Sequence, residues 1–284
     1  MSKFRLHFFK ERTRDLNVEA IIAFFEVIDG FDVEIDEESI RFNYTHPRLD
    51  YKARFLIMPR SQVRDIYRLS ANFLDVNFQL EIPILSPDYF VEHLLNITKR
   101  LVERFDLYVY NESFEDVLPY RQDLIMKVFN IIKNNYLELN PKYLSTYHLT
   151  TKDRLNAILR YMDDHLELQK YYKDSNTYLP YYYLLVNNEG RLRVSVEWQY
   201  DTLTVIPPFV EFIFLNRGNE VNIIRYDEFL EQADKFLEDV PGFIKGTKVV
   251  GKKNLKKINK ILKKNKFSKV LEVFTKVDHS NILD

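Results

Sequence analysis

The stretch Asp75-Val-Asn-Phe-Gln-Leu-Glu-Ile82 decides the fold of the first half of the chain. Its apolar residues alternate strictly with polar ones. Because the side chains of a strand point alternately to opposite faces, this pattern predicts a β-strand with one face in the core and one face in water. Pro83 lacks the N–H group that a sheet ladder needs, so we expect the strand to end there.

A helix and a second strand follow directly. Ser86-Pro-Asp88 predicts the helix start, with Ser86 as N-cap and Pro87 as the first helical residue. Apolar residues then recur every three or four positions, which predicts an amphipathic helix of about five turns. These residues are Phe90, Leu94, Ile97, Leu101 and Phe105. Residues 106–110 read as a second strand, and we expect the two strands to lie side by side, joined by the helix.

The residues before this stretch complete an α+β domain. The spacing of apolar residues predicts a strand at 3–9, a helix from Asn17 to Gly30, strands at 31–35, 40–44 and 51–58, and a short helix at 61–69. We expect both long helices to cover one face of a mainly antiparallel sheet. This order resembles the order in helix-grip and TATA-binding-protein-like folds. The resemblance concerns strand order alone and implies no activity.

The second half repeats this mixture of helices and strands. It predicts helices at 119–136 and 150–162, two hairpins that turn at Asn187–Gly190 and Asn216–Asn219, and a helix at 226–237. The similarity raises the hypothesis of a duplicated fold, with residues 17–105 matching residues 151–238.

We therefore expect an α+β fold with two layered domains, each a mainly antiparallel sheet of four or more strands flanked by helices. The predicted domains are residues 1–115 and 116–240. A lysine-rich helical tail would follow at residues 241–284.

Composition limits the class of protein. The 284 residues are 46% hydrophobic, which fits a filled core and excludes disorder. There is no cysteine, which excludes disulfides, thiolate metal sites and a cysteine nucleophile, and favours a cytoplasmic location. We expect no membrane span, because no run of about 18 apolar residues occurs. Charged residues interrupt residues 1–7, so we expect no secretory signal there.

Lysine is concentrated near the C-terminus. Residues 241–270 contain eleven lysines and no acidic residue. Apolar residues at helical spacing predict two short helices here, one around 255–262 and one around 267–274. The lysines could bind the phosphates of RNA or DNA, or meet a membrane surface, or be solvated while the apolar stripe docks on the chain itself. The candidate contacts for nucleic acid or another anion are Lys252, Lys253, Lys256, Lys257, Lys260, Lys263 and Lys264.

The sequence offers little for catalysis. The most interesting histidine is His165, because Asp163 or Asp164 could share a divalent ion with it. We interpret this group instead as a polar helix end. We interpret His93 as solvated on the outer side of its helix. Phosphate-binding glycine loops, serine-hydrolase elbows and metalloprotease motifs do not occur. We therefore assign no catalytic residue, no metal and no cofactor.

Tyrosines are dense between residues 171 and 183. Those in the predicted strand after Pro180 are expected to pack within the sheet. Tyr171, Tyr172 and Tyr178 precede that strand, and for them packing and protein contact are equally good interpretations.

Our leading hypothesis is a non-catalytic cytoplasmic interaction or scaffold protein, which binds a protein partner or itself through aromatic residues or a sheet edge. The alternative is an RNA- or DNA-associated protein that binds the phosphate backbone through the lysine-rich segment. A contiguous exposed apolar patch would favour the first hypothesis. An array of lysines on one open face would favour the second.

Overall fold

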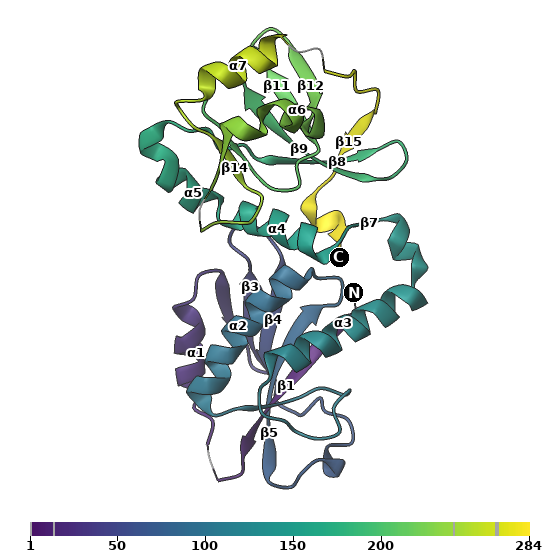
Figure 1. Cartoon of the computed structure of the whole chain (residues 1–284). Helices are drawn as coiled ribbons and strands as arrows, with labels where there is room; N and C mark the ends of the chain where they lie inside the picture. Colours follow the sequence, from purple (N-terminus) through teal and green to yellow (C-terminus); the bar gives the residue numbers. More distant parts are fainter. Residues whose placement is uncertain (1, 14, 241, 265–266) are drawn as a thin grey trace. The chain divides into compact units, whose positions relative to one another are not determined.

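The chain forms two compact units, residues 1–143 and residues 144–284. Figure 1 shows the computed structural model, which describes residues 2–13, 15–240, 242–264 and 267–284. The division lies after Tyr143, whereas the sequence led us to expect it near residue 115. The difference comes from one helix, Gln122–Leu139, which packs on unit 1 by placing Phe129 5.5 Å from the Phe4 ring.

Helices and strands alternate along both units. The helices are α1 Val18–Glu26, α2 Asp88–Phe105, α3 Gln122–Leu139, α4 Lys152–Asp163, α5 His165–Tyr172, α6 Tyr226–Ala233 and α7 Leu255–Lys264. The strands of unit 1 are β1 Lys3–Glu11, β2 Phe31–Ile35, β3 Ile40–Thr45, β4 Lys52–Ile57, β5 Phe73–Pro83 and β6 Tyr108–Tyr110. Those of unit 2 are β7 His148–Leu149, β8 Tyr182–Asn187, β9 Leu192–Gln199, β10 Val205–Ile206, β11 Phe212–Asn216, β12 Val221–Arg225, β13 Leu237–Asp239, β14 Lys248–Val250, β15 Phe274–Lys276 and β16 Ile282–Leu283.

Unit 1 confirms the predicted α+β class, with an antiparallel sheet and helices against it. Its strands lie in the order β2-β3-β4-β5-β1-β6. The predicted adjacency of the two strands around α2 is wrong, because β1 pairs antiparallel with both β5 and β6 and lies between them. The predicted helix at 61–69 is a single 3-10 turn, Ile66–Arg68.

Phenylalanines fill the core of unit 1. Phe25 of α1 lies 4.4 Å from Phe42 and 4.9 Å from Phe55, measured between ring centroids. Phe90 of α2 stacks on Tyr44, which belongs to the same strand as Phe42. Both helices therefore cover the same face of the sheet, as the sequence predicted, and the opposite face carries the polar residues of the alternating strands.

The ends of the unit 1 helices test the predicted caps. Asn17 accepts a hydrogen bond from Ala20 N at 2.8 Å, so the predicted N-cap of α1 is confirmed. The predicted cap at Ser86 is wrong, because α2 begins at Asp88 with Pro87 in the N-cap position and no side-chain cap. Gly30 has φ +90°, and a Cβ there would lie 2.5 Å from the Thr45 carbonyl oxygen. Only glycine fits this close approach of two chain segments.

Unit 2 contains a five-stranded sheet in the order β12-β11-β9-β8-β15. The two predicted hairpins are present as β8·β9 and β11·β12. If residues 17–105 matched residues 151–238, strands β2 to β5 would correspond in chain order to β8, β9, β11 and β12. The pair β9·β11 is parallel, whereas the corresponding pair β3·β4 is antiparallel. Strand direction therefore differs between the two halves, which argues against a simple duplication.

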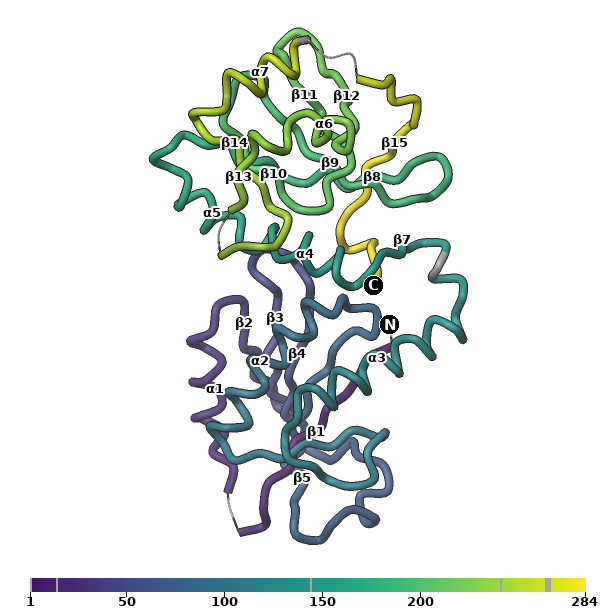
Figure 2. The backbone as a smooth tube through the Cα atoms, viewed as in Figure 1, coloured from purple at the N-terminus to yellow at the C-terminus, as the bar shows by residue number. Residues whose placement is uncertain are grey.

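The C-terminal residues belong to unit 2 rather than to a separate tail. Residues 248–250 form β14, which pairs with β10 and β13, and residues 274–276 form β15 at one edge of the five-stranded sheet. The predicted helix around 255–262 is α7, but the second predicted helix is wrong. Residues 267–273 contain neither helix nor strand, and they connect α7 to β15 (Figure 2).

None of the helices formed by the described residues combines the length and the hydropathy that a membrane crossing requires.

Candidate functional site

Helix α7 is anchored to unit 2 through the apolar side of its surface. Ile258 and Leu262, four residues apart, are both buried. Arg217 donates a hydrogen bond from Nη2 to the Leu262 carbonyl oxygen at 2.8 Å, near the helix end where carbonyl groups lack helical partners. The apolar stripe of α7 therefore docks on unit 2, which agrees with the interpretation that the stripe packs on the chain itself. This packing determines which side of α7 faces outward.

The opposite side of α7 carries the lysines. Lys256, Lys260 and Lys263 are exposed, and their spacing of four and three residues places them on one face of the helix. Lys257 is exposed beside them, with Nζ 5.1 Å from the Phe236 ring centroid. Together with the exposed Lys252 and Lys253, these six residues are called the lysine face below.

The charge of the lysine face is largely uncompensated. Among the described residues, the six lysines form one ion pair, from Lys253 Nζ to Glu238 Oε1 at 3.4 Å. Lys264 ends α7, but its side chain lies outside the described residues. The five lysines other than Lys253 therefore have ammonium groups that can bind anions. Binding to a phosphate backbone uses such an array of lysines.

The three candidate tyrosines have different surroundings. Tyr171 is 71% exposed and meets Tyr172 edge to face at 4.8 Å. Tyr178 is half-buried, and its backbone bonds to Leu203 and Val205. Burial raises the pKa of both Tyr172 and Tyr178. Of the three, Tyr171 has the most open ring surface for a partner.

The acidic and histidine cluster at the α4–α5 junction does not converge. His165 is buried and stacks on Tyr181 with 4.1 Å between ring centroids, and burial lowers its pKa. Asp164 instead pairs with Arg160 at 3.6 Å. Within the described residues no group of three or more histidine or acidic side chains could hold a metal ion.

His93 departs from its predicted solvated position. Its Nε2 lies 2.8 Å from the Tyr44 hydroxyl, and its ring stacks on Tyr44 and lies 4.8 Å from the His46 ring. The sequence showed His93 on the polar side of α2, but the partner that reaches it belongs to β3, so no local pattern could have revealed the contact.

A buried carboxylate organises the uncovered face of the unit 1 sheet. Glu81 on β5 accepts hydrogen bonds from Lys3 at 2.6 Å, Arg54 at 2.8 Å and Arg5 at 3.2 Å. Burial alone would raise its pKa, but these three cations lower the pKa of Glu81 to about 2. A polar groove of about 660 Å³ lies over this face, and Arg5, Arg41 and Arg54 contribute to its lining.

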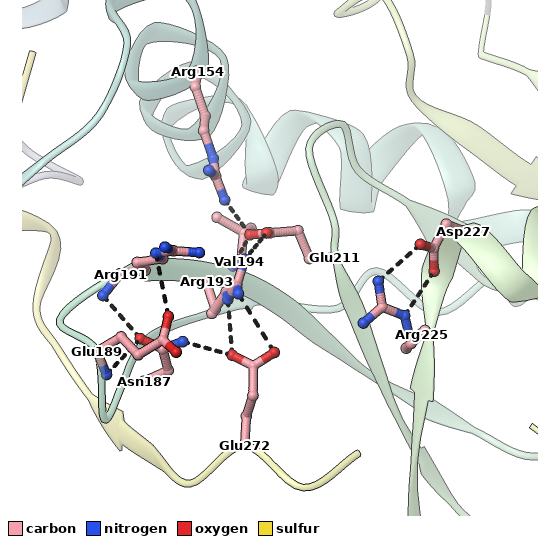
Figure 3. A network of polar contacts seen from close by, with 10 residues as sticks. All are labelled: Arg154, Asn187, Glu189, Arg191, Arg193, Val194, Glu211, Arg225, Asp227 and Glu272. Carbon is pink, nitrogen blue, oxygen red and sulfur yellow. Dashed lines mark hydrogen bonds and ion pairs between the residues drawn. The ribbon is translucent and has the colours of Figure 1, made fainter. Parts of the chain in front are cut away.

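A second polar network ties distant segments of unit 2 together (Figure 3). Arg193 on β9 donates to Glu211 at 2.9 Å and to Glu272 at 3.0 Å, and Arg154 of α4 also donates to Glu211. Asn187 adds a bond to Glu272 at 2.8 Å. Two carboxylates balance two guanidinium groups, so this network has no surplus charge for a ligand and acts as a structural link.

Neither a protein-family model, nor a curated protein, nor a solved structure matches this chain.

Proposed function

We propose that this protein is a non-catalytic binding protein that associates with RNA or DNA through the lysine face of α7. The supporting observation is the set of exposed lysines, of which only Lys253 has an acidic partner among the described residues. Lysines on one face can follow a phosphate backbone and displace its counterions, which gives affinity without sequence preference. Because α7 is anchored by Ile258 and Leu262, these lysines are held on a folded surface.

The rest of the chain is compatible with this role. The proposal requires no cofactor, and the ammonium groups supply all the recognition chemistry. We also propose a cytoplasmic location, because the chain contains no cysteine and therefore no disulfide of the kind that proteins of oxidising compartments often carry.

The first test measures affinity as a function of salt. Fluorescence anisotropy with a labelled 20-nucleotide single-stranded RNA and a labelled DNA duplex would compare the natural protein with the triple variant K256E/K260E/K263E. We expect at least a tenfold loss of affinity, and a slope of log K against log salt for the duplex that is shallower by about 3, since each phosphate contact contributes about 0.9.

The matched control moves the same charge change to unit 1. The variant K52E/K99E/K127E alters three exposed lysines outside the lysine face. Far-UV circular dichroism would verify that both variants are folded. Salt-insensitive binding by the natural protein, absence of binding, or equal losses in the two variants would contradict the proposal.

A second candidate function is protein contact through Tyr171. This ring lines a hollow of about 370 Å³ together with Val240 and Phe243. Exposed tyrosine beside apolar side chains is typical of protein interfaces. Sedimentation velocity over a concentration series would test self-association, and we expect Tyr171→Ala to abolish any dimer. A monomer at all concentrations would exclude self-association through this surface.

A further inference from the structure

Strand β12 is an edge of the five-stranded sheet, and among the described residues it pairs with β11 alone. Hydrogen bonds from Arg217 N to Glu220 O and from Tyr226 N to Glu211 O, both 2.9 Å, close the two ends of this hairpin. Bonded and non-bonded pairs alternate in an antiparallel ladder. Asn222 and Ile224 therefore bond to β11, and the N–H and C=O groups of Val221 and Ile223 and the N–H of Arg225 point away from the sheet.

These outward groups are available for pairing. Among the described residues, no hydrogen bond occupies the backbone N–H or C=O of Val221 or Ile223, or the N–H of Arg225. The C=O of Arg225 is used by the first turn of α6, for which Arg225 is the N-cap. The strand has one charged residue, Arg225. Its guanidinium is paired with Asp227 at 3.0 Å and with Glu228 at 3.8 Å.

The other edges of the two main sheets are protected. β2 carries Asp32 and Glu34 along its length. β6 is capped by a bridge between Val109 and Leu118. β15 has only three residues, one of them Lys276. Charges, covering segments and short length are the usual defences of a sheet edge. β12 has five residues, and its one charged residue, Arg225, stands at its end and is paired with Asp227 and Glu228.

A groove of about 420 Å³ runs along β12, bounded on its other side by α7 and residues 267–270. Its apolar walls include Val221, Ile223, Leu262 and Phe267. Of the described residues that line it, Arg217 and Lys269 are charged and none is acidic. A slot between a strand edge and a second segment accepts an extended chain better than it accepts a globular surface, and its charge favours an acidic one.

We propose that the β12 groove binds an extended segment of a partner protein that alternates apolar and acidic residues. The segment adds a sixth strand and pairs with the outward N–H and C=O groups of Val221 and Ile223 and with the N–H of Arg225. Its apolar side chains enter the groove, and its carboxylates face Lys269, since Arg217 is already bonded to Leu262 O and Asn222. This site is distinct from the lysine face and recognises a peptide rather than a phosphate backbone.

The test uses an acetylated, fluorescein-labelled peptide of ten residues that alternates valine and glutamate. Fluorescence polarisation would compare it with an isomer that carries lysine in place of glutamate, and with a version N-methylated at alternate residues, which cannot form the ladder. We expect saturable binding of the acidic peptide to the full chain, and at least tenfold weaker binding of both comparison peptides.

Protein variants separate backbone pairing from side-chain contact. Ile223→Pro removes an outward N–H that the fold does not use, and proline is tolerated at a free edge. We expect it to weaken binding at least tenfold, whereas the control Ile223→Ala keeps the N–H and weakens it less. Lys269→Glu should weaken the acidic peptide three- to tenfold and improve binding of the lysine isomer.

Several outcomes would overturn the proposal. These are no binding of the acidic peptide, equal binding of the N-methylated peptide, or full binding by a folded Ile223→Pro protein. A concentration-dependent dimer that Ile223→Pro abolishes would instead assign the edge to a second copy of this chain. If Ile223→Pro does not fold, the N-methylated peptide and Lys269→Glu decide the question with an intact sheet.

Discussion

Each unit contains a network of ion pairs around a carboxylate. The network of unit 1 joins strands of one sheet, and the network of unit 2 attaches a segment without secondary structure to the sheet. Glu81 in unit 1 links β1, β4 and β5, which are already neighbours in one sheet. Glu272 in unit 2 belongs to the connection between α7 and β15 and reaches β8 and β9. The first network reinforces strands that backbone hydrogen bonds already join, and the second fastens a segment that has no ladder of its own.

The networks also differ in burial and charge. The Glu81 side chain is 5% exposed and faces three cations, whereas Glu272 is 24% exposed and shares Arg193 with Glu211. Removing a carboxylate from the first site leaves three positive charges together around a buried position. Removing one from the second leaves Arg193 with another carboxylate. The cost of a deletion should therefore be larger in unit 1.

The largest effect is expected for Glu81→Gln. We expect it to lower the free energy of unfolding by about 2–3 kcal/mol, since hydrogen bonds between charged groups are lost and the three cations repel each other. Urea denaturation followed by far-UV circular dichroism would measure the change. Glu34→Gln is the control, because its exposed ion pair with Arg41 at 3.6 Å should contribute less than about 0.5 kcal/mol. Equal effects of the two substitutions would contradict the role assigned to Glu81.

The pH dependence sharpens the same comparison. The pKa of Glu81 is about 2 in the folded protein, against an ordinary value of 4.5. A lowered folded-state pKa gives stability that is complete above the unfolded pKa and is lost as the pH falls toward the folded one. The stability difference between the natural protein and Glu81→Gln should therefore be constant near pH 7 and shrink between pH 4.5 and 2. Urea midpoints of both proteins at pH 7, 5, 4 and 3 would measure it, and a difference that stays constant would refute the assignment.

The spacing of apolar residues along the chain was sufficient to predict most helices and strands. Strict alternation in residues 75–82 and the three-to-four spacing after Asp88 are properties of the chain itself, and both the strand and the helix formed. The details differ, since Ser86 does not cap the helix and Gln79 and Glu81, expected to face water, are buried. The turns at Asn187–Gly190 and Asn216–Asn219 were also found from their residue types alone. Where the chemistry of neighbouring residues decides the structure, the sequence is informative.

The networks could not be predicted, because they depend on how distant strands pair. Glu81 meets Arg5 only because β1 inserts beside β5 in one register, and a shift of one residue would turn it to the other face. Residues 267–274 misled us for a related reason. Their apolar residues fit a helical spacing, but pairing of β15 with β8 selects the extended form. Burial therefore alternates against the sequence, with Leu271 and Val273 exposed and Glu272 half-buried.

The charge of the lysine face was visible in the sequence, and its presentation was not. The composition gave eleven lysines, but docking of Ile258 and Leu262 decides which of them point outward. The open edge at β12 was equally hidden, because an edge is a property of the assembled sheet and not of the strand.

The smallest effect is expected for Glu272→Gln. We expect a loss of about 1 kcal/mol, since Arg193 keeps Glu211 as a partner and the glutamine can still accept from Asn187. Trp198, the only tryptophan and buried in unit 2, gives a fluorescence signal for urea denaturation of this unit. The control Glu189→Gln removes an exposed pair with Arg191 at 3.4 Å and should change stability by less than about 0.5 kcal/mol. If Glu272 fastens the segment before β15, its loss should also speed amide hydrogen exchange in residues 274–276 while leaving β9 protected. Uniform exchange across unit 2 would mean that Glu272 contributes only to global stability.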